Sequence, residues 1–347
     1  MEKTSKISTI IFFSINIFYN VNYASFCYSS LIMKDFPKIC WIIPILSLVP
    51  YLLLIFFYKE ENFKENEKYH LFFKIIMGIN SVIHSSILIY ISSLILGNAF
   101  FKISFCSLFI ILSSIICIYL STLKIDQLYR LGTILSLCIL FFVPLFFDIE
   151  IANQPYLDIF PDTVSFNILK SLYFTVIYFD LFLYTLYNKQ YAKPLSKKIL
   201  IFSGLIIGVI TSLQIIDSYT LVNYRYYEDI KILSLNRYFS HQGRRFFEHL
   251  DIVLLYILLT TCFFKCPFYT ITTNHVYKIK KWLFLPIYYL IILTISFSLL
   301  YNSKLIYLIC LIGSCSTFIL AIFIVIFSRR VKDAEWFKKP TNDFWWY

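Results

Sequence analysis

The sequence predicts an all-α polytopic membrane protein with about ten transmembrane helices, forming a single membrane domain over residues 1–347. The chain is 59% hydrophobic with a mean hydropathy of +0.73, and only 15% of its residues are charged. Soluble domains have roughly 25% charged residues. Apolar runs of about 18 residues or more recur along the whole chain, and each is long enough to cross a hydrocarbon core of roughly 30 Å. We therefore predict that the chain lies in a lipid bilayer.

Short polar connectors separate the predicted spans, and the spans divide into two sets of five. The first set belongs to residues 1–149 and the second to residues 164–328, with a tail at 329–347. Because each set has an odd number of spans, the second set would be inverted relative to the first, as in many secondary transporters. In that architecture the first helix of each half is broken, which here means the first and sixth spans. The spans cover residues 7–29, 38–58, 70–99, 103–123, 131–149, 164–187, 199–222, 246–267, 282–300 and 304–328.

The basic residues predict the orientation. The net charge is +11, but lysines and arginines lie between the apolar runs and form no amphipathic stripe, which argues against nucleic-acid binding. Connectors predicted to be cytoplasmic carry most of them, including Arg130, so both termini are expected in the cytoplasm. The acidic connector at 148–162 agrees with an external position, whereas the basic loop at 223–245 disagrees.

Polar residues in the first span are the first candidates for a ligand site. Asn20, Asn22 and Ser25 lie where a lipid-facing helix would have Leu or Ile. Asn side chains can bond backbone groups that are freed where a helix unwinds. The alternative is that these groups only bridge neighbouring helices.

The sixth span contains an acid, Asp180, with Thr175 and Tyr178 nearby. An acid at membrane depth costs at least roughly 2.5 kcal/mol and is a functional candidate by default. Alternatively, Asp180 could lie close to the cytoplasmic interface, near Lys189.

Other charged residues are candidates for gating or structural roles. Glu248 and Asp251 lie three residues apart at the start of the eighth span, on one helix face, where a solvated helix start is the alternative. Lys265 lies near the predicted end of that span and could extend its ammonium to the interface.

Enzyme, cofactor and metal signatures are absent from the sequence. It has no GxSxG, P-loop or HExxH motif, and no CxxC or Cys/His ligand spacing. Cys262 and Cys266 could share a ligand at i, i+4, although cysteine in such places usually behaves as a small hydrophobe. We therefore predict no catalytic residue, no cofactor and no metal.

Several segments carry a family resemblance that extends from about residue 8 to residue 332. They resemble the endospore germination permeases, the B-type subunits of nutrient germinant receptors, within the amino acid/polyamine/organocation superfamily. The sequence departs from that family at Asn22 and Phe179, where small glycines are expected and where larger side chains fill space left for a ligand. The segments are SSLIMKDFPKICW at 29–41, IDQLYRLGTIL at 125–135, DIEIANQPYLDIFPD at 148–162, SLYFTVIYFDLFLY at 171–184 and FFEHLDIVLLY at 246–256.

The resemblance implies a protein of the spore inner membrane that binds a small nutrient, such as an amino acid, and triggers germination. It also implies an A-type membrane subunit and a C-type lipoprotein as partners. Two other functions stay open. One is a proton- or sodium-coupled amino acid transporter, and the other is a membrane glycan polymerase or acyltransferase that uses Arg225, Arg237 and His241 of the 223–245 loop.

Overall fold

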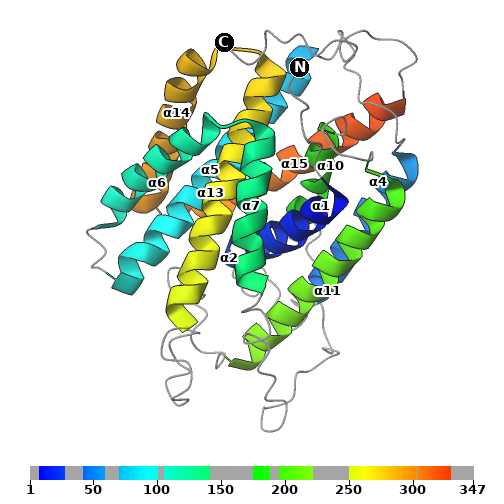
Figure 1. Ribbon diagram of the computed structural model, residues 1–347, viewed down its shortest axis with the longest axis horizontal. Coiled ribbons are helices and arrows are strands. Elements are labelled where there is room, and N and C mark those ends of the chain that lie inside the picture. The colour runs from blue at the N-terminus through cyan, green and yellow to red at the C-terminus, as the bar shows by residue number, and fades with distance from the viewer. Residues whose placement is uncertain are drawn as a thin grey trace.

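The computed structural model describes residues 8–27, 42–58, 70–100, 105–140, 175–187, 195–221, 250–302 and 304–329. Within these ranges all regular elements are helical and join into ten helices, which confirms the all-α prediction. The first helix comprises α1, a π-helix η1 and α2, and another comprises α9 and α10 (Figure 1). The elements are α1 Thr9–Ile15, η1 Asn16–Asn20, α2 Val21–Cys27, α4 Ile43–Phe57, α5 His70–Phe100, α6 Cys106–Ser121, α7 Ile125–Leu140, α9 Thr175–Phe179, α10 Leu181–Thr185, α11 Lys197–Leu221, α13 Leu250–Tyr277, α14 Lys281–Tyr301 and α15 Leu305–Arg329.

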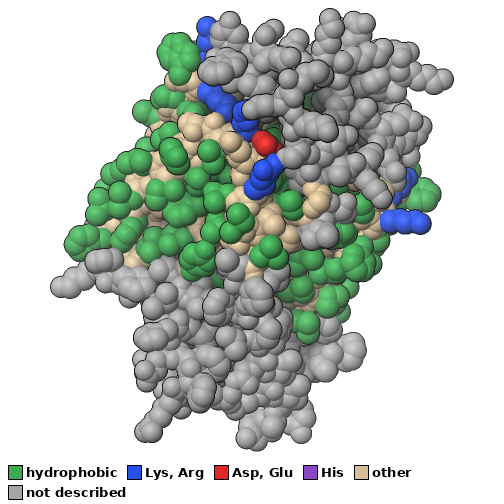
Figure 2. Space-filling model, in the orientation of Figure 1, with side chains coloured by type: hydrophobic (Ala, Val, Ile, Leu, Met, Phe, Trp, Pro, Cys, Tyr) green, Lys and Arg blue, Asp and Glu red, His purple; other side chains and the backbone are tan. Residues whose placement is uncertain are grey.

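Three of the described helices are long and apolar enough to cross a membrane, over Leu71–Leu94, Lys281–Tyr301 and Leu305–Ile326. Their outer faces are apolar as well: Trp282 and Leu290 of α14 are 71% and 67% exposed. In Figure 2, hydrophobic side chains cover much of the described surface, with lysines and arginines gathered toward the upper part and the right-hand edge of the view. Lipid tails stabilise such a surface and water does not. The chain is therefore an integral membrane protein.

The pair α5 and α13 forms the centre of the bundle. These two helices make the most extensive contact in the described part of the chain, and α5 also packs against α6, α14 and α15. In the apolar stretch of α5, 78% of the residues are buried inside the protein, compared with 39% for α14. Most side chains in the apolar stretch of α5 are therefore shielded from lipid by the other helices.

Helix α13 is longer than the sequence predicted. The predicted span ended at residue 267, but the helix continues through Pro267 to Tyr277 and has 28 residues. A proline removes one backbone donor but does not end a helix whose neighbours and hydroxyl side chains satisfy the freed groups. Residue 265 consequently lies within the helix and not near its end.

Many buried hydroxyl groups bond their own helix. Ser47, Ser114 and Thr211 each donate to the carbonyl four residues earlier, at 2.7 to 2.8 Å. Such a bond satisfies the hydroxyl without a partner from another helix. These residues explain why the interior contains serine and threonine, and they point to no ligand.

Hydrogen bonds between helix ends indicate which ends lie together. The Lys281 ammonium, at the start of α14, donates to the carbonyl of Thr122 at the end of α6, at 3.1 Å. The Tyr277 hydroxyl, at the end of α13, donates to the backbone carbonyl of Lys74 near the start of α5, at 2.9 Å. The Lys197 ammonium, at the start of α11, donates to the backbone carbonyl of Phe56 near the end of α4, at 3.1 Å. In Figure 1 these ends lie in the upper half of the view.

Candidate functional site

The first helix contains a π-helical turn at the position of its polar residues. Residues Asn16–Asn20 form η1, in which Asn16 and Asn20 are fully buried. The Asn20 amide donates to the Asn16 side-chain oxygen at 3.4 Å. π-helical turns inside α-helices occur frequently at functional sites. The helix therefore widens here, in place of the unwinding that the sequence suggested.

The other irregular helix is interrupted at a single residue, Asp180. This residue separates α9 from α10, while its backbone keeps helical dihedral angles. Its N–H donates to the carbonyl of Val176 at 2.9 Å, and its carbonyl accepts from Leu183 at 3.0 Å. The N–H of Asp180 thus keeps the α-helical partner four residues earlier, whereas its carbonyl bonds the residue three positions later, as in the tighter turn of a 3₁₀-helix. Within residues 175–187, the part of the sixth span that the structure describes, the predicted interruption is thus one turn residue and no segment is unwound.

Lys265 of α13 joins the two irregular helices. Its ammonium donates to Asp180 Oδ2 and to Asn20 Oδ1, and both members of the ion pair are fully buried. Removing two charges from water costs several kcal/mol per ion, which only close pairing and further hydrogen bonds offset. Buried ion pairs at membrane depth usually mark functional positions.

Tyrosines surround the ion pair. The Tyr269 hydroxyl, one helical turn after Lys265, donates to Asp180 Oδ2 at 2.9 Å. The Lys265 ammonium lies 5.5 Å from the ring centroids of Tyr23 and Tyr269 and 5.8 Å from that of Tyr184. Aromatic faces at this distance attract a cation. The four helical segments η1, α2, α10 and α13 thus form a cation site that a side chain of the protein itself occupies.

Two polar atoms at this site have no hydrogen-bond partner among the described residues. They are Asp180 Oδ1 and Asn16 Nδ2, both fully buried. A buried polar group that lacks a partner costs about 1–3 kcal/mol. The site therefore offers one further acceptor and one further donor, at opposite ends of the chain of hydrogen bonds from Asp180 through Lys265 and Asn20 to Asn16.

A second polar cluster lies beside the first. His84 of α5 bonds the Tyr23 hydroxyl through Nδ1 and the Thr317 hydroxyl through Nε2, the latter at 2.8 Å. Thr317 in turn donates to the Asn80 side-chain oxygen at 2.5 Å. The His84 ring stacks on Tyr269 with centroids 5.6 Å apart. This cluster connects α2, α5 and α15 to the tyrosine that holds Asp180.

The structure brings together only some of the residues that the sequence singled out. Asn20 and Asp180 belong to one site. Tyr178 is buried but donates to the Pro44 carbonyl of α4 at 2.8 Å, and Asn22 is half-buried on α2 without joining the ion pair. Arg130 is exposed on α7. The other candidate residues lie outside the residues or side chains that the structure describes: Ser25, Thr175, Glu248, Asp251 and the loop residues Arg225, Arg237 and His241.

One expectation about a charged residue was wrong. Lys265 does not extend to the membrane interface, because α13 continues well beyond it and its side chain is fully buried. For Asp180, the structure favours the first of the two readings, a buried acid, because Asp180 is fully buried and paired with Lys265. Phe179 fills space, as the sequence suggested: it is buried, and its ring lies 5.1 Å from that of Phe318.

Sequence reasoning missed Lys265, Tyr269 and His84. A signal for Lys265 was present, since an acid inside one apolar span needs a basic partner inside another. Pro267 concealed this signal, because a span that ends at the proline places Lys265 near the membrane interface. His84 and Tyr269 lack such a signal, because their roles depend on which helix faces they share.

A comparison of the chain with protein-family models and with curated proteins finds no match.

Proposed function

We propose that this chain is the permease-like subunit of a spore germinant receptor, which binds a small nutrient of the amino-acid class at the membrane midplane. The observation that carries the proposal is the buried Lys265–Asp180 ion pair, at the point where the two irregular helices meet. The resemblance of the sequence to the germination permeases supplies the receptor context. It includes the spore inner membrane, an A-type membrane subunit and a C-type lipoprotein.

The packing of the helices supports the inverted repeat that this proposal needs. Each described helix of residues 1–149 has a counterpart five spans later, and contacts recur when counterparts are exchanged. Helices α1 and α7 are in contact, and so are their counterparts α9 and α15; α2 contacts α11 as α9 contacts α4; and α5 contacts α14 as α13 contacts α6. Recurrence of this kind is expected of two copies of one fold related by a pseudo-two-fold axis.

The chemistry of the site supports a ligand with an amino group. Lys265 already presents an ammonium to Asp180, to Asn20 and to the faces of three tyrosines. A free amino acid carries the same ammonium, so it can replace Lys265 at the same acceptors. The unpartnered Asp180 Oδ1 provides a further acceptor. A ligand that binds better when Lys265 is displaced shifts a pre-existing equilibrium between two arrangements of the helices.

A proton-coupled amino acid transporter is the second candidate, and the same ion pair favours it. Acids inside membrane spans often mark the ion pathways and proton relays of pumps and transporters. Coupling to sodium is less favoured than coupling to protons, because the Lys265 ammonium already occupies the Asp180 carboxylate that a sodium ion would need.

Two measurements separate these candidates. Spores that carry the chain with its receptor partners are exposed to a panel of the common amino acids, and the loss of refractility is followed. The isolated chain is reconstituted in proteoliposomes and tested for uptake of labelled amino acids. Receptor function predicts germination without uptake, whereas uptake that depends on a proton gradient would replace the proposal with the transporter. The expected result for Asp180→Asn is loss of the nutrient response in a protein that is still inserted.

A further inference from the structure

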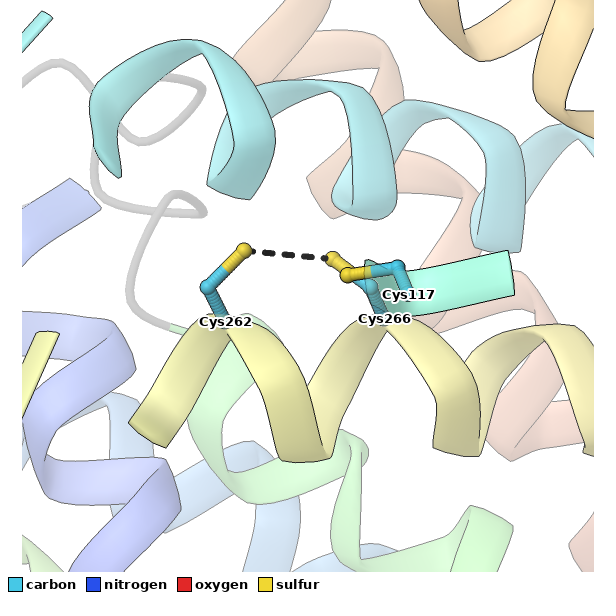
Figure 3. A group of neighbouring side chains, drawn as sticks. All are labelled: Cys117, Cys262 and Cys266. Atoms are coloured by element: carbon cyan, nitrogen blue, oxygen red, sulfur yellow. Dashed lines mark hydrogen bonds between the residues drawn. The ribbon is translucent and has the colours of Figure 1, made fainter. Parts of the chain in front are cut away.

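Three cysteines converge in the interior on the side of α13 that faces α6. Cys262 and Cys266 lie one turn apart on α13, and Cys117 comes from α6 (Figure 3). All three side chains are fully buried. Their sulfur atoms lie within 4.8 Å of one another, and those of Cys262 and Cys266 are 3.8 Å apart. Sequence spacing revealed only two of the three, because the third comes from a distant helix.

This spacing suits a shared metal ion. Thiolates bound to one metal at about 2.3 Å lie about 4 Å from each other. The Cys262–Cys266 separation is 3.8 Å, and the separations of Cys117 from these two sulfurs do not exceed 4.8 Å. Cysteines that served only as small hydrophobes would not need to direct their sulfurs at one point from two helices.

Polar groups of α5 contact two of the three sulfur atoms. The Ser92 hydroxyl of α5 donates to Cys262 Sγ at 3.6 Å, which stabilises negative charge on that sulfur. The Cys266 thiol donates to the Ser85 carbonyl of α5, also at 3.6 Å, a bond that is given up when the thiol becomes a metal-bound thiolate. Hydrogen bonds to ligand atoms orient the ligands of a metal and tune its affinity. Helix α5 thus supports the cluster from a third direction.

We propose that Cys117, Cys262 and Cys266 form a three-coordinate site for a soft monovalent metal ion, with Cu(I) as the ion that fits best. Thiolates select soft ions, and carboxylate-preferring ions such as Mg²⁺ and Ca²⁺ are disfavoured. A structural Zn²⁺ takes four ligands, whereas the group in the described residues contains three sulfurs and no histidine or carboxylate. On binding, each cysteine that becomes a thiolate forms a Cu–S bond and releases its S–H proton to solvent, and the copper stays Cu(I).

The test uses the purified full-length chain under anaerobic conditions. Cu(I) is supplied from a chromogenic Cu(I)-specific chelator, and transfer to the protein is followed by the loss of chelator colour. The expected result is one Cu(I) per chain, with three sulfur neighbours at about 2.3 Å in X-ray absorption. Replacing Cys117, Cys262 or Cys266 singly by serine should weaken binding by at least about tenfold, since losing an outer partner alone costs 10–100-fold.

Cys310→Ser provides the matched control, because Cys310 is a fully buried free thiol on α15 outside the cluster. Its copper affinity should equal that of the wild type. Monodisperse elution and an unchanged thermal unfolding midpoint establish that each variant is folded. Unchanged copper binding by the triple variant C117S/C262S/C266S would overturn the proposal, as would nitrogen or oxygen neighbours in the absorption spectrum or no transfer of copper to folded wild-type protein. Because no nutrient enters the test, its outcome is independent of the receptor function.

Discussion

The Lys265 ammonium and the Asp180 carboxylate, 85 residues apart in the sequence, form a fully buried ion pair between α13 and the α9–α10 junction. Asn20 of the π-helical turn accepts from the same ammonium, so one lysine connects both irregular helices. Displacing that lysine would release two helices at once.

The first prediction separates the stabilising role of the ion pair from its role in the response. Asp180→Asn or Lys265→Gln alone leaves one buried charge without its partner and should cost about 3–5 kcal/mol of stability. The double variant D180N/K265Q leaves no buried charge, so its thermal unfolding midpoint should recover most of the loss. The exposed Lys198 of α11 supplies the control Lys198→Gln, which should have no effect. If the double variant is as unstable as the sum of the single ones, the two residues do not act as a pair.

The second prediction concerns the hydroxyl of Tyr269, which donates to Asp180 Oδ2 at 2.9 Å. Tyr269→Phe should lower stability by about 1.5–3 kcal/mol, because the lost bond is to a charged group. Tyr178→Phe removes a bond of similar length to a neutral carbonyl and should cost about 1 kcal/mol. Chemical denaturation of both variants in the same detergent compares them. Equal costs would argue that Asp180 is uncharged in the folded protein.

The third prediction tests the close contact between α7 and α13. A Cβ atom at Gly132 would lie 2.5 Å from Cδ2 of Phe264, whose ring is stacked on Tyr19 at 4.3 Å and cannot easily move. Gly132→Ala should therefore destabilise the protein by about 1–3 kcal/mol, although alanine favours helix formation. Ile134→Ala, at an exposed position of the same helix, is the control and should be nearly neutral. A stabilised Gly132→Ala variant would show that the helices can separate without cost.

The fourth prediction concerns orientation. The ends of α6 and α13 lie together with the start of α14, and the predicted topology assigns them to the cytoplasm. Thr122→Cys should therefore be protected from a membrane-impermeant maleimide in right-side-out vesicles, while Asn302→Cys, at the opposite end of α14, should be labelled. Wild-type protein gives the background from native thiols. The reverse labelling pattern would invert the topology.

Hydropathy was sufficient for the helical class, because apolar runs of span length can satisfy their backbone groups only as helices. The polar centres of the first and sixth spans also led to Asn20 and Asp180, since amides and acids are costly in an apolar run. The partner of Asp180 could not be found in the same way. A proline after Lys265 resembles a helix end in the sequence, but in a bundle the neighbouring helices allow the helix to continue.

The direction of Tyr178 was equally inaccessible from the sequence. Its place two residues before Asp180 suggested a shared pocket, whereas residues i and i+2 point to different faces of a helix. The structure accordingly directs Tyr178 to α4 and not to the ion pair. The cysteine cluster depends in the same way on the packing of α6 against α13, which spacing within one helix does not encode.

The most direct test of the central claim is the effect of amino acids on the thermal unfolding midpoint of the purified chain and of the D180N/K265Q variant. A ligand that binds only the folded protein raises its midpoint in a concentration-dependent way. We expect at least one amino acid from a panel of the common ones to stabilise the wild type and to leave the double variant unchanged. Equal stabilisation of both proteins, or no stabilisation of the folded wild type by any of the panel, would contradict a ligand site at the Lys265–Asp180 pair.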